Sequence, residues 1–183
     1  MQRARLAAHQ VDTDIRNRGG PMTAPASPTA RSADAATAFR TLLLQRYVDL
    51  VRHCAALGMT VDAVDTERVR MRLPCRPEFI GDTEHALLHN GVITSLIDSA
   101  CGCAVGARIG KPQRIATLDL RVDYLRAATF GADLLCEAEC YRLARSIAFV
   151  RAQVWQGSAE TTPIAHAVAA FILSTSTTNS GFL

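Results

Sequence analysis

The spacing of apolar residues changes along this chain and predicts one long buried helix. Residues 87–107 (LLHNGVITSLIDSACGCAVGA) are apolar on nearly every side, and Asp98 is the only acidic residue among them. A helix that is apolar all round is normally buried. Its many alanine, cysteine and glycine residues indicate that other segments pack closely against it. This stretch is therefore expected to be the centre of the fold.

One face of the predicted helix differs from the others. Polar and glycine residues recur along it at three- and four-residue spacing, which places them on a single helix face. These residues are Gly91, Thr94, Ser95, Asp98, Gly102 and Gly106. A groove with polar atoms, missing side chains and one carboxylate on a buried helix is a candidate site.

The flanking segments predict a second helix and several strands. Residues 34–57 place apolar residues near helical spacing and are followed by Gly58, a favoured residue after a helix end. Residues 60–73 alternate basic with apolar residues, so we expect a strand whose arginines face solvent or bind phosphate. Four antiparallel strands joined as a meander are expected after the central helix. They span 115–125, 134–143, 147–156 and 164–174, the last of them buried on both faces.

The two ends of the chain differ from the rest in composition. Residues 1–33 mix arginine with aspartate and then become rich in Pro, Ala, Ser and Thr, so we expect a flexible N-terminal segment and no secretory signal. Met22 is an alternative start of translation within it. Residues 34–176 are expected to form a single domain, and residues 177–183 a frayed tail.

Composition narrows the class of protein. Hydrophobic residues make up 49% of the 183 residues, which suffices for one core, and the net charge of +3 is too small to argue for nucleic acid. No membrane span is expected, because the one long apolar stretch is interrupted by glycine and polar residues. The six cysteines form no C-x-x-C pair and no histidine lies at zinc-ligand spacing. We therefore expect reduced thiols in the cytoplasm, no metal and no organic cofactor.

The central helix and the strand after it resemble a known family. HNGVITSLIDSACG is similar to the HGG-x(6)-D helix of hotdog-fold acyl-CoA thioesterases of the phenylacetate-degradation (PaaI-like) type, and RIATLDLRVDYLRAA is similar to the strand that follows there. The resemblance spans about Leu57 to Ser174, and Asn90 replaces the first glycine of the pattern. Periodicity alone gives only an α+β class. Together with the resemblance it implies a hotdog fold, an antiparallel sheet wrapped around a central helix, with an additional N-terminal helix.

The resemblance also implies an activity, the hydrolysis of an acyl-CoA thioester to the free acid and CoA. Asp98 would activate water or act as the nucleophile. Helix N-termini present unpaired N–H groups, and those of Gly91 and Val92 would hold the carbonyl oxygen as an oxyanion hole. The glycine at position 91 would let the substrate approach the backbone. His89 would orient the carbonyl or the loop, and Asn90 adds a side-chain amide that the family's glycine lacks.

Other residues are assigned to substrate binding. Thr94 and Ser95 would support Asp98, and Thr117 matches a polar position that in this family approaches the acid from the neighbouring subunit. Asp82 and Thr83 lie in the loop that leads to the helix N-terminus. Cations for the CoA phosphates lie in or beside loops, and Arg142 and Arg145 are assigned to this role among Arg108, Lys111, Arg126, Arg142 and Arg145. The family pattern further implies a homodimer or homotetramer with the acyl pocket between subunits.

Two other functions stay open from the sequence. The chain could be a non-catalytic acyl-CoA-binding regulatory hotdog module, an alternative that the Asn90 departure favours. It could also be a hotdog enoyl-CoA hydratase or dehydratase, although the His89 and Asp98 pair resembles the thioesterase arrangement better. Of the remaining histidines, His53 is expected to be an exposed or half-buried residue and His166 a core residue, neither with a role in the chemistry.

Overall fold

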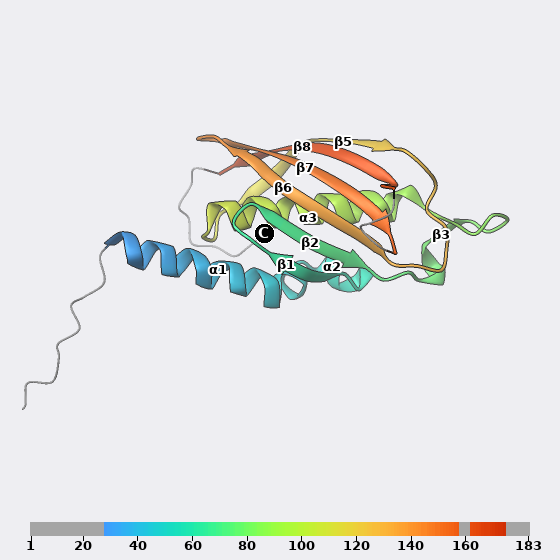
Figure 1. Ribbon diagram of the computed structural model, residues 1–183, viewed down its shortest axis with the longest axis horizontal. Coiled ribbons are helices and arrows are strands. Elements are labelled where there is room, and N and C mark those ends of the chain that lie inside the picture. The colour runs from blue at the N-terminus through green and yellow to red at the C-terminus, as the bar shows by residue number, and fades with distance from the viewer. Residues whose placement is uncertain (1–27, 158–161, 175–183) are drawn as a thin grey trace, which may run out of the picture.

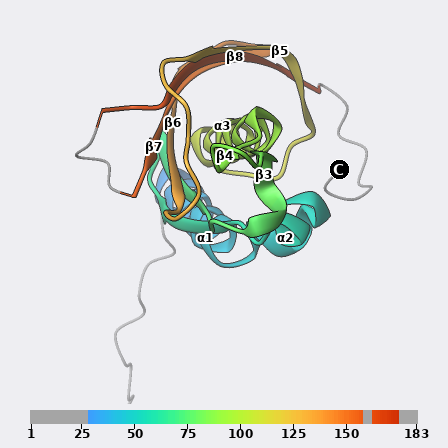
Figure 2. The same cartoon turned by 90° about the vertical axis from the view of Figure 1, so that its right-hand side faces the viewer.

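The long apolar helix lies at the centre of the fold, as its pattern predicts. In the computed structural model, which describes residues 28–157 and 162–174, α3 (Asn90–Ile109) is enclosed by a curved sheet (Figures 1 and 2). The apolar residues of α3 pack into one continuous core with the inner face of that sheet. This is the hotdog arrangement expected from the sequence.

The sheet has six antiparallel strands in the order β1-β2-β6-β7-β8-β5. The strands are β1 (Thr60–Val64), β2 (Arg68–Leu73), β5 (Ile115–Tyr124), β6 (Leu134–Leu143), β7 (Ile147–Gln156) and β8 (Ala165–Leu173). Two expectations need correction. Residues 60–73 form a hairpin rather than one strand, and only β6 to β8 form a meander, because β5 crosses to the far side of β8. One side of β5 therefore has no strand partner among the described residues.

The last strand was expected to be buried on both faces, and it is not. Buried and exposed residues alternate along β8, so only one of its faces belongs to the core. His166 lies on the other face and is exposed rather than a core histidine. Alanines and Phe171 supply the buried face, where short side chains let the sheet approach α3. The exposed face of β8 carries apolar residues as well, so its sequence does not distinguish a half-exposed strand from a buried one.

The N-terminal helix is longer than predicted and is broken near its end. α1 (Pro28–Leu50) starts at Pro28, so residues 28–33 of the segment expected to be flexible are helical, while residues 1–27 lie outside the described part. Val51, in an extended conformation, separates α1 from α2 (Arg52–Leu57). Gly58 follows with φ of 71°, the left-handed conformation expected of a glycine after a helix end.

α1 packs antiparallel to α3 across the glycine face of the central helix (Figures 1 and 2). A Cβ placed on Gly106 would lie 3.6 Å from Leu43 Cδ1, and one placed on Gly102 would lie 3.5 Å from the Tyr47 hydroxyl. The C-terminal half of the groove predicted from the sequence is therefore filled by another helix. Gly102 and Gly106 serve helix packing, which leaves the N-terminal half of α3 for a site.

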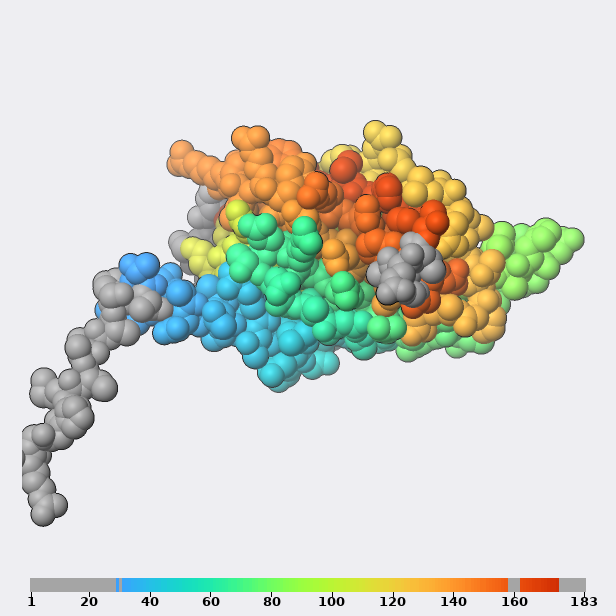
Figure 3. Space-filling model, in the orientation of Figure 1, coloured from blue at the N-terminus to red at the C-terminus, as the bar shows by residue number. Residues whose placement is uncertain are grey.

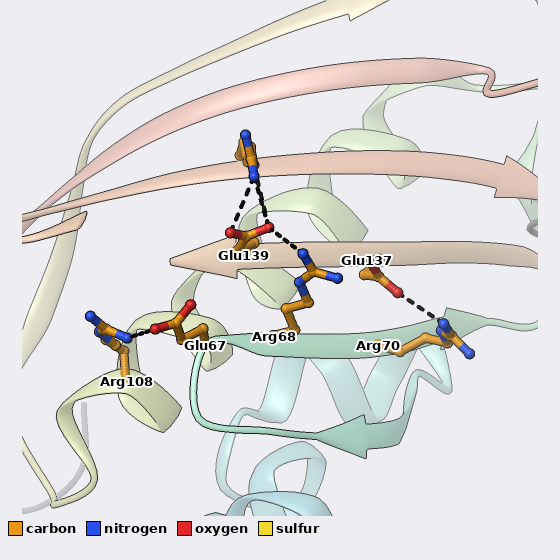
Figure 4. Close-up of polar contacts among 7 residues, drawn as sticks. Glu67, Arg68, Arg70, Arg108, Glu137 and Glu139 are labelled. Carbon is orange, nitrogen blue, oxygen red and sulfur yellow. Dashed lines mark hydrogen bonds and ion pairs between the residues drawn. The ribbon is translucent and has the colours of Figure 1, made fainter. Parts of the chain in front are cut away.

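The arginine row of β2 forms ion pairs across the outer face of the sheet (Figure 4). Arg70 contacts Glu137 of β6 at 2.8 Å, and Glu139 of β6 lies between Arg68 at 3.2 Å and Arg151 of β7 at 3.1 Å. These arginines have carboxylate partners within the chain, which favours the solvated-face alternative over phosphate binding. Arg108 in the last turn of α3 is likewise paired with Glu67.

Two very short strands position the start of α3. The 3-10 helix η1 (Pro77–Phe79) leads into β3 (Ile80–Asp82), which pairs with β4 (Leu87–Leu88). The connection between them projects beyond the sheet (Figures 1 and 3). The backbone N–H of His89 donates to the Phe79 carbonyl at 2.8 Å. His89, the residue before the helix, is thus bonded through its backbone to η1.

Most of the cysteines and the apolar residues of α3 are buried in the core. All six cysteines are free, and five of them are buried. By length and composition α3 is the one helix of the described part that could span a membrane. Its apolar residues lie between the sheet and α1, so its hydrophobicity is accounted for by the core.

Candidate active site

The carboxylate of Asp98 is held by a single hydrogen bond. Thr117 of β5 donates its hydroxyl to Asp98 Oδ1 at 2.8 Å, and the Asp98 side chain is half-buried. Asp98 Oδ2 has no hydrogen-bond partner among the described residues. The predicted pairing of these two residues is present, but it lies within one chain, whereas the family resemblance had implied a contact from the neighbouring subunit. One oxygen of the acid is therefore positioned and the other is available for chemistry.

His89 is the N-cap of α3 and is fixed through its ring. The Gly91 N–H donates to His89 Nδ1 at 2.9 Å, which satisfies one of the unpaired donors of the helix start. A nitrogen that accepts a hydrogen bond carries no proton, so a neutral His89 holds its proton on Nε2. His89 therefore offers an Nε2–H donor.

Two glycines clear the space that the imidazole occupies. A Cβ on Gly91 would lie 2.8 Å from His89 Nδ1, and a Cβ on Gly81 of β3 would lie 2.9 Å from His89 Cβ. Neither distance is compatible with ordinary van der Waals contact. The sequence suggests Gly91 as room for the substrate to approach the backbone. In the structure the missing side chain makes room for His89.

The oxyanion donors expected from the sequence already have acceptors. The Gly91 N–H is bonded to His89 Nδ1, and the Val92 N–H donates to the His89 carbonyl at 3.1 Å. The Asn90 N–H, at the first residue of the helix, has no acceptor among the described residues. Donors for a substrate oxygen at this helix end are thus the Asn90 N–H and His89 Nε2–H.

The other two polar residues of the helix face bond to their own helix. The Thr94 hydroxyl donates to the Asn90 carbonyl at 3.1 Å, and the Ser95 hydroxyl donates to the Gly91 carbonyl at 3.0 Å. Neither forms a hydrogen bond to Asp98, so the support expected from them is not seen. Ser95 Oγ lies 3.4 Å from Nε2 of His53, an exposed residue of α2 that is assigned no role from the sequence.

A hollow of about 510 Å³ opens in front of the helix N-terminus. It is lined by Gly81, Asp82, His89, Asn90, Tyr124 and Arg126, among others. Asp82 caps the turn after β3 by accepting from the backbone N–H groups of Glu84 at 2.9 Å and His85 at 3.2 Å. The side-chain hydrogen bond from His85 lowers the pKa of Asp82. Asp82 therefore shapes the rim of the hollow, and Thr83 lies exposed beside it.

The cations assigned to the CoA phosphates lie elsewhere in this chain. Arg142 and Arg145 belong to the β6–β7 hairpin, which contacts the end of β8 through Ser146, near the C-terminus of α3 (Figure 1). That is the end of α3 opposite to the hollow. Arg126 is the arginine that lines the hollow, where its guanidinium donates to the Thr162 carbonyl at 2.7 Å.

The interior behind Asp98 is apolar and keeps its polar groups neutral. Burial raises the pKa of the Tyr47 hydroxyl well above its usual value, and nearby thiols and Asp98 raise it further. Tyr47 thus remains a donor, and its hydroxyl bonds to the Ser99 carbonyl at 3.0 Å. Burial likewise raises the pKa of the Cys54 thiol, which donates to Ser99 Oγ at 3.2 Å. These groups fix the helix backbone next to the acid.

Comparison with known proteins identifies the family. The family model described as "Thioesterase superfamily" matches residues 85–162, which include α3 and the strands β5, β6 and β7. A protein of Halobacterium salinarum that bears the name "Putative esterase" is 33% identical over 111 residues, which cover 57% of this chain and 70% of that protein. The chain belongs to the thioesterase superfamily. This thioesterase is also 29% identical over 112 residues to the medium/long-chain acyl-CoA thioesterase YigI of Escherichia coli K12, covering 54% of this chain and 72% of YigI.

A solved structure supports the more specific assignment. A variant of the phenylacetic acid degradation protein PaaI from Thermus thermophilus superposes with a TM-score of 0.58 at 26% identity, covering 66% of this chain and 97% of that one. The PaaI-like hotdog assignment made from HNGVITSLIDSACG is confirmed. The thioesterase therefore carries, in the family's fold, an aspartate on the central helix and a histidine at its N-terminus.

Sequence reasoning missed Tyr124 and weighted Arg126 no more than other arginines. By alternation Tyr124 belongs to the apolar face of β5, with Leu120 and Val122, so its hydroxyl gave no signal of its own. In the structure that hydroxyl lies 2.7 Å from Thr94 Oγ1 and donates to the Asn90 carbonyl at 3.2 Å. A hydroxyl at the end of a strand that runs beside the helix is the pattern that would have found it.

Proposed function

We propose that this protein hydrolyses acyl-CoA thioesters, with Asp98 of one subunit acting on a carbonyl held by the helix N-terminus of another. The observation that carries the proposal is the Asp98 carboxylate, which Thr117 holds through one oxygen while the other stays free. The names of its relatives support the substrate class, since YigI is an acyl-CoA thioesterase. No metal or organic cofactor is needed for this chemistry.

Asp98 supports two balanced routes. As a general base its Oδ2 takes a proton from water, the water oxygen bonds to the thioester carbon, and the C–S bond breaks to release CoA thiolate. As a nucleophile Oδ2 bonds to that carbon, CoA thiolate leaves, and water then attacks the Asp98 carboxyl carbon of the mixed anhydride, which releases the acid and leaves the water oxygen on Asp98. A single turnover in ¹⁸O-labelled water separates them, because only the second route leaves ¹⁸O in the Asp98 carboxyl group.

The two halves of the site are too far apart on one helix to act on the same carbonyl. Asp98 follows Asn90 by eight residues, which is about 12 Å along an α-helix. A carbonyl held by His89 Nε2–H and the Asn90 N–H therefore cannot be attacked by the Asp98 of its own chain. A second copy with its α3 running antiparallel, and a two-fold axis near Thr94, would bring Asn90 of one chain opposite Asp98 of the other.

The edge strand β5 is the surface on which we propose this pairing. Its outer side has no strand partner among the described residues, and an open edge of this length favours addition of another strand. Leu118 and Leu125 expose 54% and 52% of their surface there. A β5–β5 contact extends the sheet across a homodimer, and two such dimers make the homotetramer. The six free thiols support our placement of the enzyme in the cytoplasm.

The test is CoA release from a panel of acyl-CoA esters by the wild type and by Asp98→Asn. The panel contains medium-chain, long-chain and phenylacetyl-CoA, and enoyl-CoA hydration is measured in parallel. Asn keeps the shape and the Thr117 hydrogen bond but loses the basic oxygen, so turnover should fall roughly a hundredfold or more. Turnover within a few-fold of wild type removes Asp98 from the mechanism. Tight binding without CoA release from any ester supports the binding module instead.

Mixed subunits test whether the site is shared. Chains with Asp98→Asn are unfolded and refolded together with chains carrying His89→Ser, which keeps a helix cap but removes the imidazole. Each hybrid dimer contains one intact site, so an equal mixture should recover about a quarter of the wild-type activity. No recovery above the separate variants would mean that both residues act within one chain.

A further inference from the structure

The peptide group between Asn90 and Gly91 is bonded at both ends to residues of the site. Its N–H belongs to Gly91 and donates to His89 Nδ1 at 2.9 Å. Its carbonyl belongs to Asn90 and lies within hydrogen-bond distance of two hydroxyls, those of Thr94 and Tyr124. The two ends of one amide therefore connect a histidine at the hollow with a tyrosine from β5.

The Asn90 carbonyl accepts a hydrogen bond from one of the two hydroxyls in either arrangement of their protons. Thr94 Oγ1 lies 3.1 Å and Tyr124 Oη 3.2 Å from the Asn90 oxygen, and the hydroxyls are 2.7 Å from each other. If Thr94 donates to the carbonyl, Tyr124 donates to Thr94, and if Tyr124 donates to the carbonyl, Thr94 donates to Tyr124. In both cases one hydroxyl donates to the carbonyl, which also accepts the backbone N–H of Thr94 as part of α3, and the triangle of hydrogen bonds is closed.

A donated proton at an amide oxygen makes the amide N–H a stronger donor, because chains of hydrogen bonds polarise one another. The N–H of this amide points at His89 Nδ1. Its donation keeps Nδ1 unprotonated and leaves the proton of the neutral ring on Nε2. The Nε2 atom has no partner among the described residues, and the ring lines the hollow. The Gly91 N–H therefore holds His89 in this tautomer, and a hydroxyl from β5 lies at the other end of the same amide.

We propose that Tyr124 is a positioning residue that acts through the Asn90–Gly91 peptide to hold His89 in its Nε2–H tautomer facing the hollow. The inference rests on the proposed function for the identity of the carbonyl that Nε2–H meets. Tyr124 touches no reacting atom. It also ties β5 to the start of α3, so the strand proposed to form the subunit contact and the donor of the site are linked by one side chain.

The tautomer of His89 can be measured directly by NMR. Uniformly ¹⁵N-labelled protein at about pH 8.5, roughly two units above the ordinary histidine pKa, gives the imidazole ¹⁵N shifts of neutral rings. The cross-peaks of His89 are identified by their loss in His89→Gln. The wild type should show Nδ1 as the unprotonated nitrogen. Tyr124→Phe should lower the share of this tautomer, and Thr94→Val with Tyr124→Phe should lower it further, since the single variant keeps one hydroxyl.

Activity provides the second reading. Turnover should fall by roughly ten- to a hundredfold in the double variant with little change in KM, as when an outer partner that orients a histidine is lost. The control is Tyr141→Phe, which removes a comparably exposed hydroxyl from the outer face of β6 and should change neither the shifts nor turnover.

An unchanged His89 tautomer in Tyr124→Phe overturns the proposal, whatever happens to turnover or to the double variant. The variants could shift the tautomer although the wild type releases no CoA. That result supports the link from Tyr124 to His89 and refutes the thioesterase proposal. The shifts are measured without substrate, so the two failures are distinguishable.

Discussion

Replacement of Gly91 by alanine separates the activity of this protein from its stability. The new Cβ would lie 2.8 Å from His89 Nδ1 and 3.1 Å from His89 Cε1. Both atoms belong to the far end of a rotatable side chain, so the imidazole will move rather than the backbone. Movement breaks the hydrogen bond from the Gly91 N–H and takes Nε2–H away from its present place at the hollow.

The two effects on stability nearly cancel. Loss of an N-cap interaction costs about 1 kcal/mol, and replacement of a helical glycine by alanine contributes up to about 1 kcal/mol in the other direction. The melting temperature should therefore stay within about 2–4 °C of wild type, the shift that 1 kcal/mol produces in a protein of this size. Turnover should fall about a hundredfold, because a displacement of about 1 Å in a positioned group is enough for that loss.

The matched control is Gly106→Ala on the same helix. Its Cβ would meet Leu43 Cδ1 at 3.6 Å, an ordinary contact, and the position lies about four turns from Gly91 and about two turns from Asp98. This variant should melt about 2–4 °C higher with unchanged turnover. Thermal melts and acyl-CoA turnover are measured on both. If Gly91→Ala turns over within a few-fold of wild type, His89 in its observed position is not needed and the assigned carbonyl donor is wrong.

Two further predictions concern titratable groups. A thiol reagent should modify at most Cys75 in the native protein, because the other five thiols are buried and burial raises the pKa of Cys101, Cys103 and Cys136; two fast-reacting thiols would contradict this. His85→Ala should raise the Asp82 pKa toward its ordinary value, because the hydrogen bond from the His85 side chain is the main cause of its lowering. The folded-state pKa lies below the unfolded one, so this stabilisation is present above about pH 4 and is lost as pH falls through the folded value. An NMR titration showing the same Asp82 pKa in both proteins would count against the contact.

The sequence was sufficient for features that depend on local pattern. The all-round apolar run predicted α3 as the buried centre, and the alternation of residues 134–156 predicted β6 and β7. The position of β5 beyond β8 was not predictable in this way, since periodicity records which face of a strand is buried and not which strand lies next to it. The same limit applies to α1, whose place on Gly102 and Gly106 is a tertiary contact that small residues permit without specifying the partner.

For the site, residue types could be predicted but hydrogen-bond partners could not. Asp98, Thr117 and His89 were found because their chemistry and spacing match a family motif. The assignment of the Gly91 and Val92 N–H groups to an oxyanion hole did not anticipate that the His89 side chain and carbonyl accept from both of them. A helix start has several unpaired N–H donors. Only the three-dimensional structure shows which of these N–H groups already donate a hydrogen bond to the N-cap residue.

Asn90 bears on whether the site is catalytic, since it replaces a glycine of the family motif. The group we assign to the carbonyl oxygen at this position is the backbone N–H, which asparagine and glycine both possess. The Asn90 side chain is exposed and has no hydrogen-bond partner among the described residues, so it neither blocks nor satisfies that N–H from within the chain. The departure therefore adds an amide at the rim of the hollow without removing a donor. We propose that it affects which acyl groups fit more than whether the thioester can be polarised, and this proposal weakens the main argument for a module that only binds.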